Sequence, residues 1–376
     1  MSTLEKDILE LLRIPSVTGA EAEIAAWIEA RLGRAGVLES HRLRRIGNSL
    51  VVLPRDGELL PRGSEGPRRP WIVLAGHTDT VPTAEAPEPT VRDGRVYGRG
   101  TADMKSGLAV MLQLLEGHDP RDGFPSRVFV FYAGEEGPAD NNELRTVLAE
   151  EEWLGGADLA ILLEPTAGAL ELGCQGSLHL EVTFQGKACH SARPWLGENA
   201  ITKALPWLAA VSAIAPRAVE IEGATFREVV SVTQIHGGET RNVIPGSLRA
   251  NLNLRYAPDR TMADAERYAH SLAPAPAIAT AVIRDHAGAA GIDSAAPLYR
   301  HLLDHSGLPR RAKQAWTDVA RFSSLGVPAL NWGPGDPALA HTKDEWVEVA
   351  QAEQVLSDLR RFLLAPGPDG RSGPTH

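Results

Sequence analysis

The sequence is poor in cysteine and in positive charge, and it has no long apolar run. Its 376 residues include only two cysteines, Cys174 and Cys189, which excludes a disulfide framework and a zinc site built from cysteine. No apolar run approaches the ~20 residues that a membrane-spanning helix needs. With 38 Lys+Arg against 48 Asp+Glu, a net charge of −10, the chain lacks the basic excess typical of nucleic-acid-binding proteins. We therefore expect no membrane and no nucleic-acid partner, and any metal must be held by histidine and carboxylate groups.

The rest of the composition is that of an ordinary globular protein. Hydrophobic residues make up 43% and charged residues 23%, which excludes disorder over most of the chain. The length suggests two domains, or one large domain with an insertion. The N-terminus carries Glu5, Lys6 and Asp7 where a signal peptide would need a basic start and an apolar core, so we expect a cytoplasmic location.

Short apolar runs that alternate with helical segments indicate an α/β domain. Two helices are expected in the first ~36 residues, and Thr18 and Glu21 have the spacing of a capping box before the second. Runs of five or six Val, Ile and Leu without alternation are typical of strands buried on both faces of a mostly parallel sheet. The predicted strands are Ser49–Leu53, Trp71–Ala75, Val128–Ala133, Leu159–Leu163 and Pro328–Trp332, and the helices between and after them include Ser106–Leu115, Asn142–Glu150 and Ala350–Leu364.

A second pattern interrupts the first. His179–Gln185 and Leu248–Tyr256 alternate apolar and polar residues, as strands do when one face of their sheet meets solvent. Helices are expected at Asn199–Ala213 and Thr261–Leu272. We therefore predict an inserted α+β domain over residues 177–285, and a discontinuous α/β domain formed by residues 1–176 and 286–376.

Potential metal ligands and bases follow the predicted buried strands. In open parallel sheets, ligands bind beyond the carboxyl ends of the strands, so residues at these positions are expected to lie close together. Asp103 lies before a helix rather than after a strand. The other candidates at strand ends are His77, Asp79, Glu135, Glu136, Glu164 and His341.

Each of these residues alone has an ordinary alternative, a core or surface histidine or a solvated acidic pair. Adjacent acids at the end of a buried strand are different, because desolvation and mutual repulsion are costly without a cation. Two histidines and three carboxylates form a mixed set of the kind that zinc accepts, and a bridging carboxylate would allow two ions. Asp79, two residues after His77, is well placed to hold the far nitrogen of its ring.

Three motifs closely resemble those of the M20 metallopeptidase family. They are GHTDTVP at Gly76–Pro82, the segment Tyr97–Gly107, and AGEEG at Ala133–Gly137. The resemblance extends to about Leu364, in a family that includes succinyl-diaminopimelate desuccinylases, acetylornithine deacetylases, aminoacylases and carboxypeptidases. The blocks that look most like desuccinylases of the actinobacterial type are Gly173–Gly176, Asn251–Pro258, and Asn331–Pro337 with His341 and Asp344-Glu345.

The resemblance implies a centre of two Zn²⁺ ions, or of Co²⁺ or Mn²⁺ in their place, bridged by Asp103. Glu135 would be the general base, which takes a proton from the attacking water and passes it to the leaving amine. The remaining ligands would be His77 and Glu164 for one ion, and Glu136 and His341 for the other.

The resemblance also implies roles for the inserted domain, as a ferredoxin-like lid and dimerisation domain of a homodimer. His190, in the segment Gly186–Ala192, would donate a hydrogen bond to the tetrahedral oxyanion, often in the neighbour's site. Arg255 and Asn242 would grip the carboxylate and acyl group of a small N-acyl amino acid. A surface-loop histidine and a solvent-exposed strand arginine are the alternatives, and Thr317, Asp318 and Arg321 receive no role.

The expected activity is hydrolysis of N-succinyl-LL-2,6-diaminopimelate to succinate and LL-2,6-diaminopimelate, in lysine and cell-wall precursor biosynthesis. An acetylornithine deacetylase or a related N-acyl-amino-acid deacylase is the main alternative, because one or two pocket residues decide such preferences. A dipeptidase is a further one. A non-catalytic binding module would be expected to lack a ligand or the base Glu135, and all of them are present.

Overall fold

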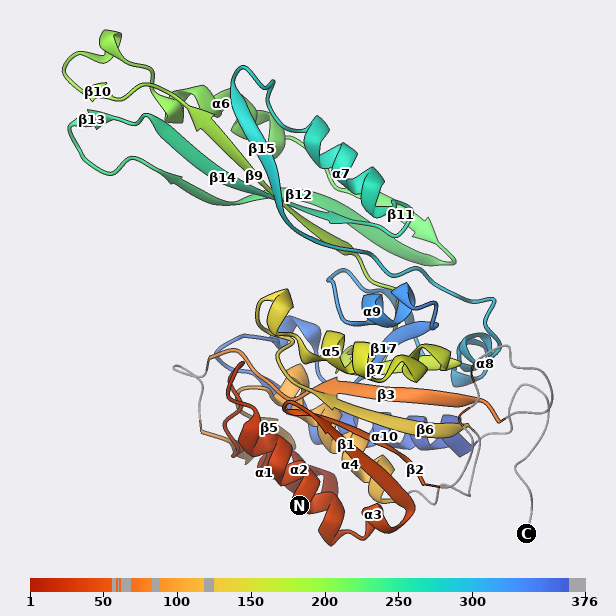
Figure 1. Cartoon of the computed structure of the whole chain (residues 1–376). Coiled ribbons are helices and arrows are strands. Elements are labelled where there is room, and N and C mark those ends of the chain that lie inside the picture. The colour runs from red at the N-terminus through yellow and green to blue at the C-terminus, as the bar shows by residue number, and fades with distance from the viewer. Residues whose placement is uncertain (56–58, 60, 62–68, 83–87, 118–124, 365–376) are drawn as a thin grey trace. The chain divides into compact units, whose positions relative to one another are not determined.

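The computed structural model describes residues 1–55, 59, 61, 69–82, 88–117 and 125–364, which form two compact units (Figure 1). The first unit comprises Met1–Leu172, Ile292–Arg311 and Arg321–His376, and the second comprises Gly173–Gly291 and Ala312–Ala320. The chain thus leaves the first unit at 172/173 and returns at 291/292, where we predicted 176/177 and 285/286. The grouping of 312–320 with the second unit was not predicted, and residues 365–376 lie outside the described residues.

The first unit is built on an eight-stranded sheet in the order β1-β2-β6-β3-β7-β17-β8-β16. Its four central strands β6, β3, β7 and β17 are parallel, whereas β1, β2 and β8 pair antiparallel with their neighbours. The strands are β1 His41–Ile46, β2 Ser49–Pro54, β3 Trp71–His77, β6 Ser126–Tyr132, β7 Leu159–Pro165, β8 Leu170–Leu172, β16 Arg310–Ala312 and β17 Ala329–Gly333.

Burial explains why these strands form the centre of the unit. Every residue of β3, β7 and β17 is buried, so both faces of the sheet are covered, as parallel sheets require. Helices α1, α4 and α10 pack against one another, and α4 also contacts β3, β6 and β7. The helices are α1 Thr3–Leu12, α2 Ala22–Arg34, α3 Val37–Ser40, α4 Ser106–Glu116, α5 Glu143–Glu150, α8 Pro297–Ser306, α9 Val319–Ser324 and α10 Val349–Leu364.

A small sheet of three strands and the start of α4 complete the part of the first unit that carries the site. The strand order of this small sheet is β18-β5-β4, and the strands are β4 Thr90–Arg92, β5 Arg95–Tyr97 and β18 Trp346–Glu348. The irregular turn Thr101–Lys105 follows β5 and leads directly into α4. The peptide bond Asp103–Met104 in this turn is cis.

The predicted capping box at Thr18 is wrong. Helix α2 begins after Glu21, whose side chain caps no helix N–H and instead accepts a hydrogen bond from the backbone of Gly19 at 2.7 Å. The Thr18 hydroxyl donates to Asp79, 61 residues further along the chain. A capping box is present at the other N-terminal helix, where Ser2 and Glu5 cap α1 reciprocally. The local motif was therefore overridden by a tertiary contact.

The second unit contains a five-stranded antiparallel sheet in the order β11-β12-β14-β9-β15. Without the edge strand β11, the succession β9-α6-β12-β14-α7-β15 is the βαββαβ unit of ferredoxin-like folds. The elements are β9 Gly176–Gln185, β10 Cys189–His190, α6 Ala200–Ser212, β11 Arg217–Ile221, β12 Ala224–Gly237, β13 Val243–Ile244, β14 Ser247–Tyr256, α7 Met262–Ser271 and β15 Ala279–Ala287.

The two faces of this second sheet differ in polarity. Alternate residues of β9 and β14, from Leu178 to Phe184 and from Leu248 to Tyr256, pack with α6 and α7 into one apolar core. The residues between them, such as His179 and Asn251, lie on the opposite face, which no helix of the second unit covers (Figure 1). The alternation read from the sequence is thus present in the structure.

Among the described residues, no helix is both long enough and apolar enough to span a membrane.

Candidate active site

The carboxyl ends of the four central parallel strands carry most of the candidate ligands. His77 is the last residue of β3, and Glu164 is the second-last residue of β7. Glu135 and Glu136 follow β6, and His341 follows β17 after a Gly-Pro-rich turn. Because these strands are parallel neighbours, their ends meet at one edge of the sheet, as the sequence predicted.

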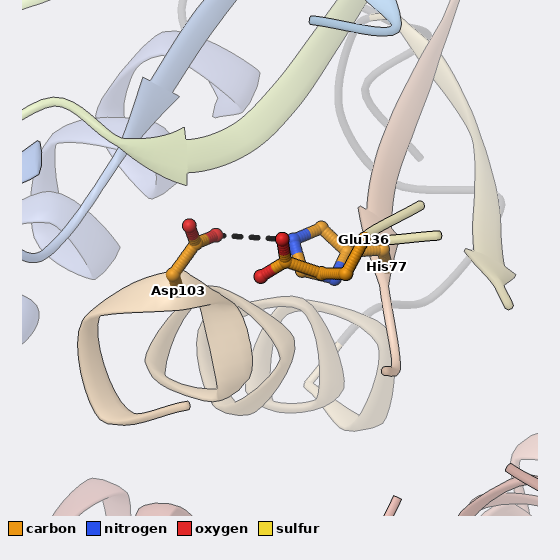
Figure 2. A group of neighbouring side chains, drawn as sticks. All are labelled: His77, Asp103 and Glu136. Carbon is orange, nitrogen blue, oxygen red and sulfur yellow. Dashed lines mark hydrogen bonds and ion pairs between the residues drawn. The ribbon is translucent and has the colours of Figure 1, made fainter. Parts of the chain in front are cut away.

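Two of these side chains and Asp103 form a cluster that could hold a metal ion (Figure 2). The ligand atoms of His77, Asp103 and Glu136 all lie within 4.8 Å of one another. The His77 ring nitrogen Nε2 is 3.0 Å from Asp103 Oδ1. Asp103 comes from the turn that opens α4, so its carboxylate is presented at the end of β3 rather than at the end of its own strand.

His341 joins the cluster on the other oxygen of Asp103. Its Nε2 is 2.8 Å from Glu136 Oε1 and 3.4 Å from Asp103 Oδ2. The Asp103 carboxylate therefore lies between two imidazoles, one at each oxygen. His341 has a positive φ of 64°, which is uncommon for a residue with a side chain, and its side chain is 51% exposed. The first-unit cluster thus has one open side.

Asp79 organises the turn after β6 as well as the His77 ring. Its two carboxylate oxygens accept hydrogen bonds from the backbone N–H groups of Glu135 and Glu136, each at 3.0 Å. The Thr18 hydroxyl donates to the same carboxylate at 2.8 Å. His77 Nδ1 lies 3.0 Å from the backbone oxygen of Asp79 and 3.5 Å from its carboxylate. One buried side chain therefore positions three candidate site residues.

The electrostatics of the cluster are those of carboxylates that require a positive partner. Burial opposes a charge on His77, yet the neighbouring carboxylates of Asp103, Asp79 and Glu164 raise its pKa well above the ordinary value. Hydrogen bonds to Asp103 and Glu136 raise the pKa of His341 to about 10. Burial alone would raise the pKa of Asp103, but its hydrogen bonds to the two histidines lower it. Without metal, the imidazoles thus supply the positive charge.

The chemistry of this donor set fits a divalent cation. Asp103, Glu136 and Glu164 carry a formal charge of −3, and Glu164 and the Glu136 side chain are buried. Desolvated carboxylates that lie close together are unfavourable unless a cation neutralises them. Imidazole nitrogens and carboxylate oxygens are also ligands that zinc prefers. Residues His77, Asp103, Glu136, Glu164 and His341 could therefore hold metal, with Glu135 beside them.

The candidate residues of the second unit lie in two separate places. His190 and Asn242 lie together at an exposed end of the unit, where β10 pairs with β13 and the Ser191 N–H donates to the Asn242 oxygen at 2.9 Å. Arg255 is opposite Ser177, near the other end of β14. It lies eight residues from Ser247, a distance of ~26 Å along the strand at ~3.3 Å per residue. The structure thus brings Asn242 and His190 together, but not Asn242 and Arg255 within one chain.

Arg255 is a half-buried cation held by its neighbours on the open face of the second sheet. Its Nε donates to Asn253 Oδ1 at 3.1 Å, and the Asn253 amide reaches His179 at 3.2 Å. No ion pair among the described residues involves Arg255. Burial lowers its pKa, which only the charge of Asp285 opposes. A half-buried guanidinium without an ion-pair partner is well suited to bind a carboxylate.

Three residues near the cluster were not identified from the sequence. Thr18 supports Asp79, and Glu345 binds the backbone of the Asp103 turn. Lys105 is buried and donates to the oxygens of Leu11 and Ile14, at 3.0 and 2.7 Å. Burial lowers the Lys105 pKa to about 7. Of the three, only Glu345 could have been found from the sequence, because it belongs to the Asp344-Glu345 motif. Thr18 and Lys105 could not, because their partners are distant in the sequence and those of Lys105 are backbone atoms.

Comparison with known proteins identifies a family and several full-length relatives. The sequence model of peptidase family M20/M25/M40 matches residues 73–365. The succinyl-diaminopimelate desuccinylase of Corynebacterium glutamicum is 39% identical over 359 residues, 94% of each chain. The DapE protein of Mycobacterium tuberculosis, provisionally named a succinyl-diaminopimelate desuccinylase, is 39% identical over 355 residues, covering 94% of this chain and 96% of that one.

Solved structures share the fold at lower sequence identity. The aminopeptidase PepT of Bacillus cereus has a TM-score of 0.70 at 18% identity, with 96% of this chain and 97% of that one covered. An M20 family metallo-carboxypeptidase of Sulfolobus solfataricus also has a TM-score of 0.70, at 15% identity and with 96% and 99% covered. At these identities the likeness shows the fold alone.

Proposed function

Because the chain belongs to peptidase family M20/M25/M40, a family of metallohydrolases, we propose that it is a di-zinc amidohydrolase that cleaves N-succinyl-LL-2,6-diaminopimelate to succinate and LL-2,6-diaminopimelate. One observation carries the choice of substrate, the 39% identity over 94% of the chain to a protein named for that reaction. The solved structures named as peptidases are 18% and 15% identical, and they favour no substrate for this chain. A cytoplasmic location is part of the proposal.

In this proposal, five side chains hold the metal. Asp103 would be shared by the two ions, His77 and Glu164 would complete one site, and Glu136 and His341 would complete the other. The contacts of Asp103 with His77 at 3.0 Å and with His341 at 3.4 Å support the bridging assignment, since each imidazole faces a different oxygen. Bound divalent metal supplies Lewis-acid polarisation of the scissile carbonyl and makes water more acidic.

Glu135 is the general base of the proposed reaction. It takes a proton from the attacking water as the water oxygen bonds to the carbonyl carbon, and it gives a proton to the nitrogen as the C–N bond breaks. The products are a carboxylate and an amine. Asp79 supports this role indirectly, because the N–H of Glu135 donates to its carboxylate at 3.0 Å and the backbone of the base is thereby held in place.

Substrate recognition is assigned to the second unit. Arg255 pairs with a substrate carboxylate, which is favoured because its half-buried guanidinium has no ion-pair partner among the described residues. His190 donates a hydrogen bond to the developing oxyanion, and Asn242 binds the acyl group. Since Arg255 lies ~26 Å along β14 from the end that carries His190 and Asn242, one small substrate cannot touch both in a single second unit. We therefore assign His190 and Asn242 to the site of a second copy.

The end of the second unit that carries His190 also favours a homodimer. Apolar side chains are exposed around β10, β13 and the start of α6, with Trp195 76% exposed. Several large exposed apolar side chains in one part of a fold favour an interaction surface there. The others are Leu196, Ile201, Leu205 and Val243.

The test is a comparison of matched substrates with zinc present. We expect rapid succinate release from N-succinyl-LL-2,6-diaminopimelate, and much slower turnover of N-acetylornithine and of a dipeptide. Preferred release of acetate from N-acetylornithine would favour the second candidate, an acetylornithine deacetylase of the same family. No succinate release from the first substrate would contradict the proposal.

A further inference from the structure

Glu345 is a buried carboxylate that binds the backbone of the turn carrying Asp103. Its side chain is 1% exposed. One oxygen, Oε1, accepts hydrogen bonds from the N–H groups of Ala102 at 2.8 Å and of Asp103 at 3.0 Å. The other, Oε2, accepts from the Gly100 N–H at 3.0 Å and from Arg99 Nη1 at 3.0 Å. Both oxygens are therefore occupied by donors, and Glu345 is not itself a metal ligand.

The backbone of this turn needs such a partner. Gly100 has a φ of 81°, and the N–H groups of Gly100, Ala102 and Asp103 converge on one carboxylate, as N–H groups do in anion-binding nests. A buried N–H without an acceptor is unfavourable, so the turn is stable in this form only with an acceptor in its centre. The Glu345 carboxylate is that acceptor, and it fixes the peptide from which the Asp103 side chain projects.

The same residue ties the turn to the segment that carries His341. Arg99 Nη1 also donates to the backbone oxygen of Thr342 at 3.0 Å, and the Gly98 N–H donates to the backbone oxygen of Glu345 at 3.1 Å. Just beyond, Trp346 of β18 pairs with Tyr97 of β5. Residues 342–346 and 97–103 are thus joined by side-chain, backbone and strand contacts. The two ligands flanking this junction, Asp103 and His341, approach to 3.4 Å.

We propose that Glu345 is a positioning residue of the metal centre. It holds the Asp103 turn and the His341 segment together, so that the two ligands are in place before metal binds. The proposal rests on the proposed function only in taking the cluster to be a metal site, and it assigns Glu345 no contact with substrate. Residues around ligands that fix their orientation typically contribute ~10–100-fold to metal affinity.

The test is zinc titration of the metal-stripped full-length protein, for the wild type and the Glu345→Gln variant. Glutamine keeps the size of the side chain but places an N–H₂ group against the Gly100 N–H or the Ala102 and Asp103 N–H groups. We expect zinc affinity to fall by ~10-fold or more. The matched control is Glu348→Gln, three residues further along the chain in β18, because Glu348 is 48% exposed and its ion pair among the described residues is with Arg95, outside the turn. We expect its affinity to equal that of the wild type.

The zinc affinity of the Glu345 variants distinguishes a positioning role of Glu345 from a purely structural one. If Glu345→Gln lowers the melting temperature of the metal-free protein and leaves zinc affinity unchanged, the proposal is overturned. If that variant does not fold, Glu345→Asp decides, since it keeps the charge but shortens the reach. An affinity loss of ~3-fold or more in Glu345→Asp supports the proposal, and wild-type affinity overturns it.

The experiment also distinguishes this proposal from the proposed reaction. A wild type that binds zinc, and a Glu345→Gln variant that binds it more weakly, support the role of Glu345 even if no succinate is released. Failure of the wild type to bind zinc would overturn both.

Discussion

The two units place their candidate residues in opposite ways. In the first unit, His77, Asp103 and Glu136 come from separate parts of the chain, and their ligand atoms lie within 4.8 Å of one another. In the second unit, Arg255 lies near one end of β14, whereas His190 lies in the separate two-stranded sheet β10-β13, beyond the opposite end of β14. The difference follows from topology, because the carboxyl ends of parallel strands share an edge, whereas the ends of antiparallel strands alternate between two edges. A parallel sheet therefore gathers candidate residues at one edge, whereas an antiparallel sheet places them at two.

Replacement of Glu135 by Gln tests the chemistry assigned to the first unit. We expect kcat to fall by about 10²–10⁴-fold with metal content unchanged, because the variant loses the proton acceptor and keeps the five ligands. Steady-state turnover and metal analysis check this, with Glu152→Gln on the exposed surface as control. Wild-type turnover in Glu135→Gln with metal bound would show that another group is the base.

Mixing two inactive variants tests whether the second unit serves a second copy. His190→Ala alone is expected to lower kcat by about 10²–10³-fold, as loss of an oxyanion donor does. In a random mixture with Glu135→Gln, one site in four would pair an intact Glu135 with an intact His190, so about a quarter of the wild-type activity should return in a C2 dimer. Co-expression with separate tags gives the mixture, and His270→Ala, exposed on α7, is the control. A mixture that stays inactive would assign His190 to its own chain's site.

The Arg255→Lys variant tests the proposed binding of a substrate carboxylate by Arg255. Lysine keeps the charge but cannot form the two parallel hydrogen bonds of a guanidinium with a carboxylate. We expect KM for the succinylated substrate to rise by ~10-fold, with kcat changed much less. Arg249→Lys, on the same strand and exposed, is the matched control. An unchanged KM would indicate that Arg255 is an ordinary strand arginine.

The smallest expected effect concerns the metal-free first unit. Hydrogen bonds raise the pKa of His341 to about 10, above its ordinary value of 6.5. Its protonated ring therefore stabilises the fold below pH 6.5, and this contribution is lost as the pH rises through about 10. The difference in unfolding free energy between the wild type and His341→Asn should shrink over this range, measured by urea unfolding with a chelator present. A difference that does not change with pH would contradict the paired state of His341.

The strands could be predicted because their signal is local. The run predicted as Trp71–Ala75 is the start of β3, and the run predicted as Leu159–Leu163 lies within β7. Their order along the chain, together with the rule for parallel sheets, was enough to place His77 and Glu164 at one edge. The resemblance to a known family contributed the assignment of each ligand to an ion, which stays a prediction.

What the sequence could not predict are the contacts that hold the ligands. Asp79 binds the backbone N–H groups of Glu135 and Glu136, and Glu345 binds those of Ala102 and Asp103. Backbone donors are the same at every residue except proline, so no residue pattern identifies which of them a carboxylate will find. The capping box at Thr18 failed for a different reason, because the Thr18 hydroxyl bonds to the carboxylate of Asp79, which is 61 residues away in the sequence.

The discontinuity of the first unit has a consequence for biosynthesis. The second unit is made almost entirely from one uninterrupted segment, Gly173–Gly291, and can fold as it leaves the ribosome. Strand β17 and His341 are translated after it. A nascent chain therefore carries His77, Asp103 and Glu136 long before His341, the last of the proposed ligands, is made. Completion of the proposed metal centre would be one of the final events in making the protein, and chains that stop early are expected to accumulate without metal.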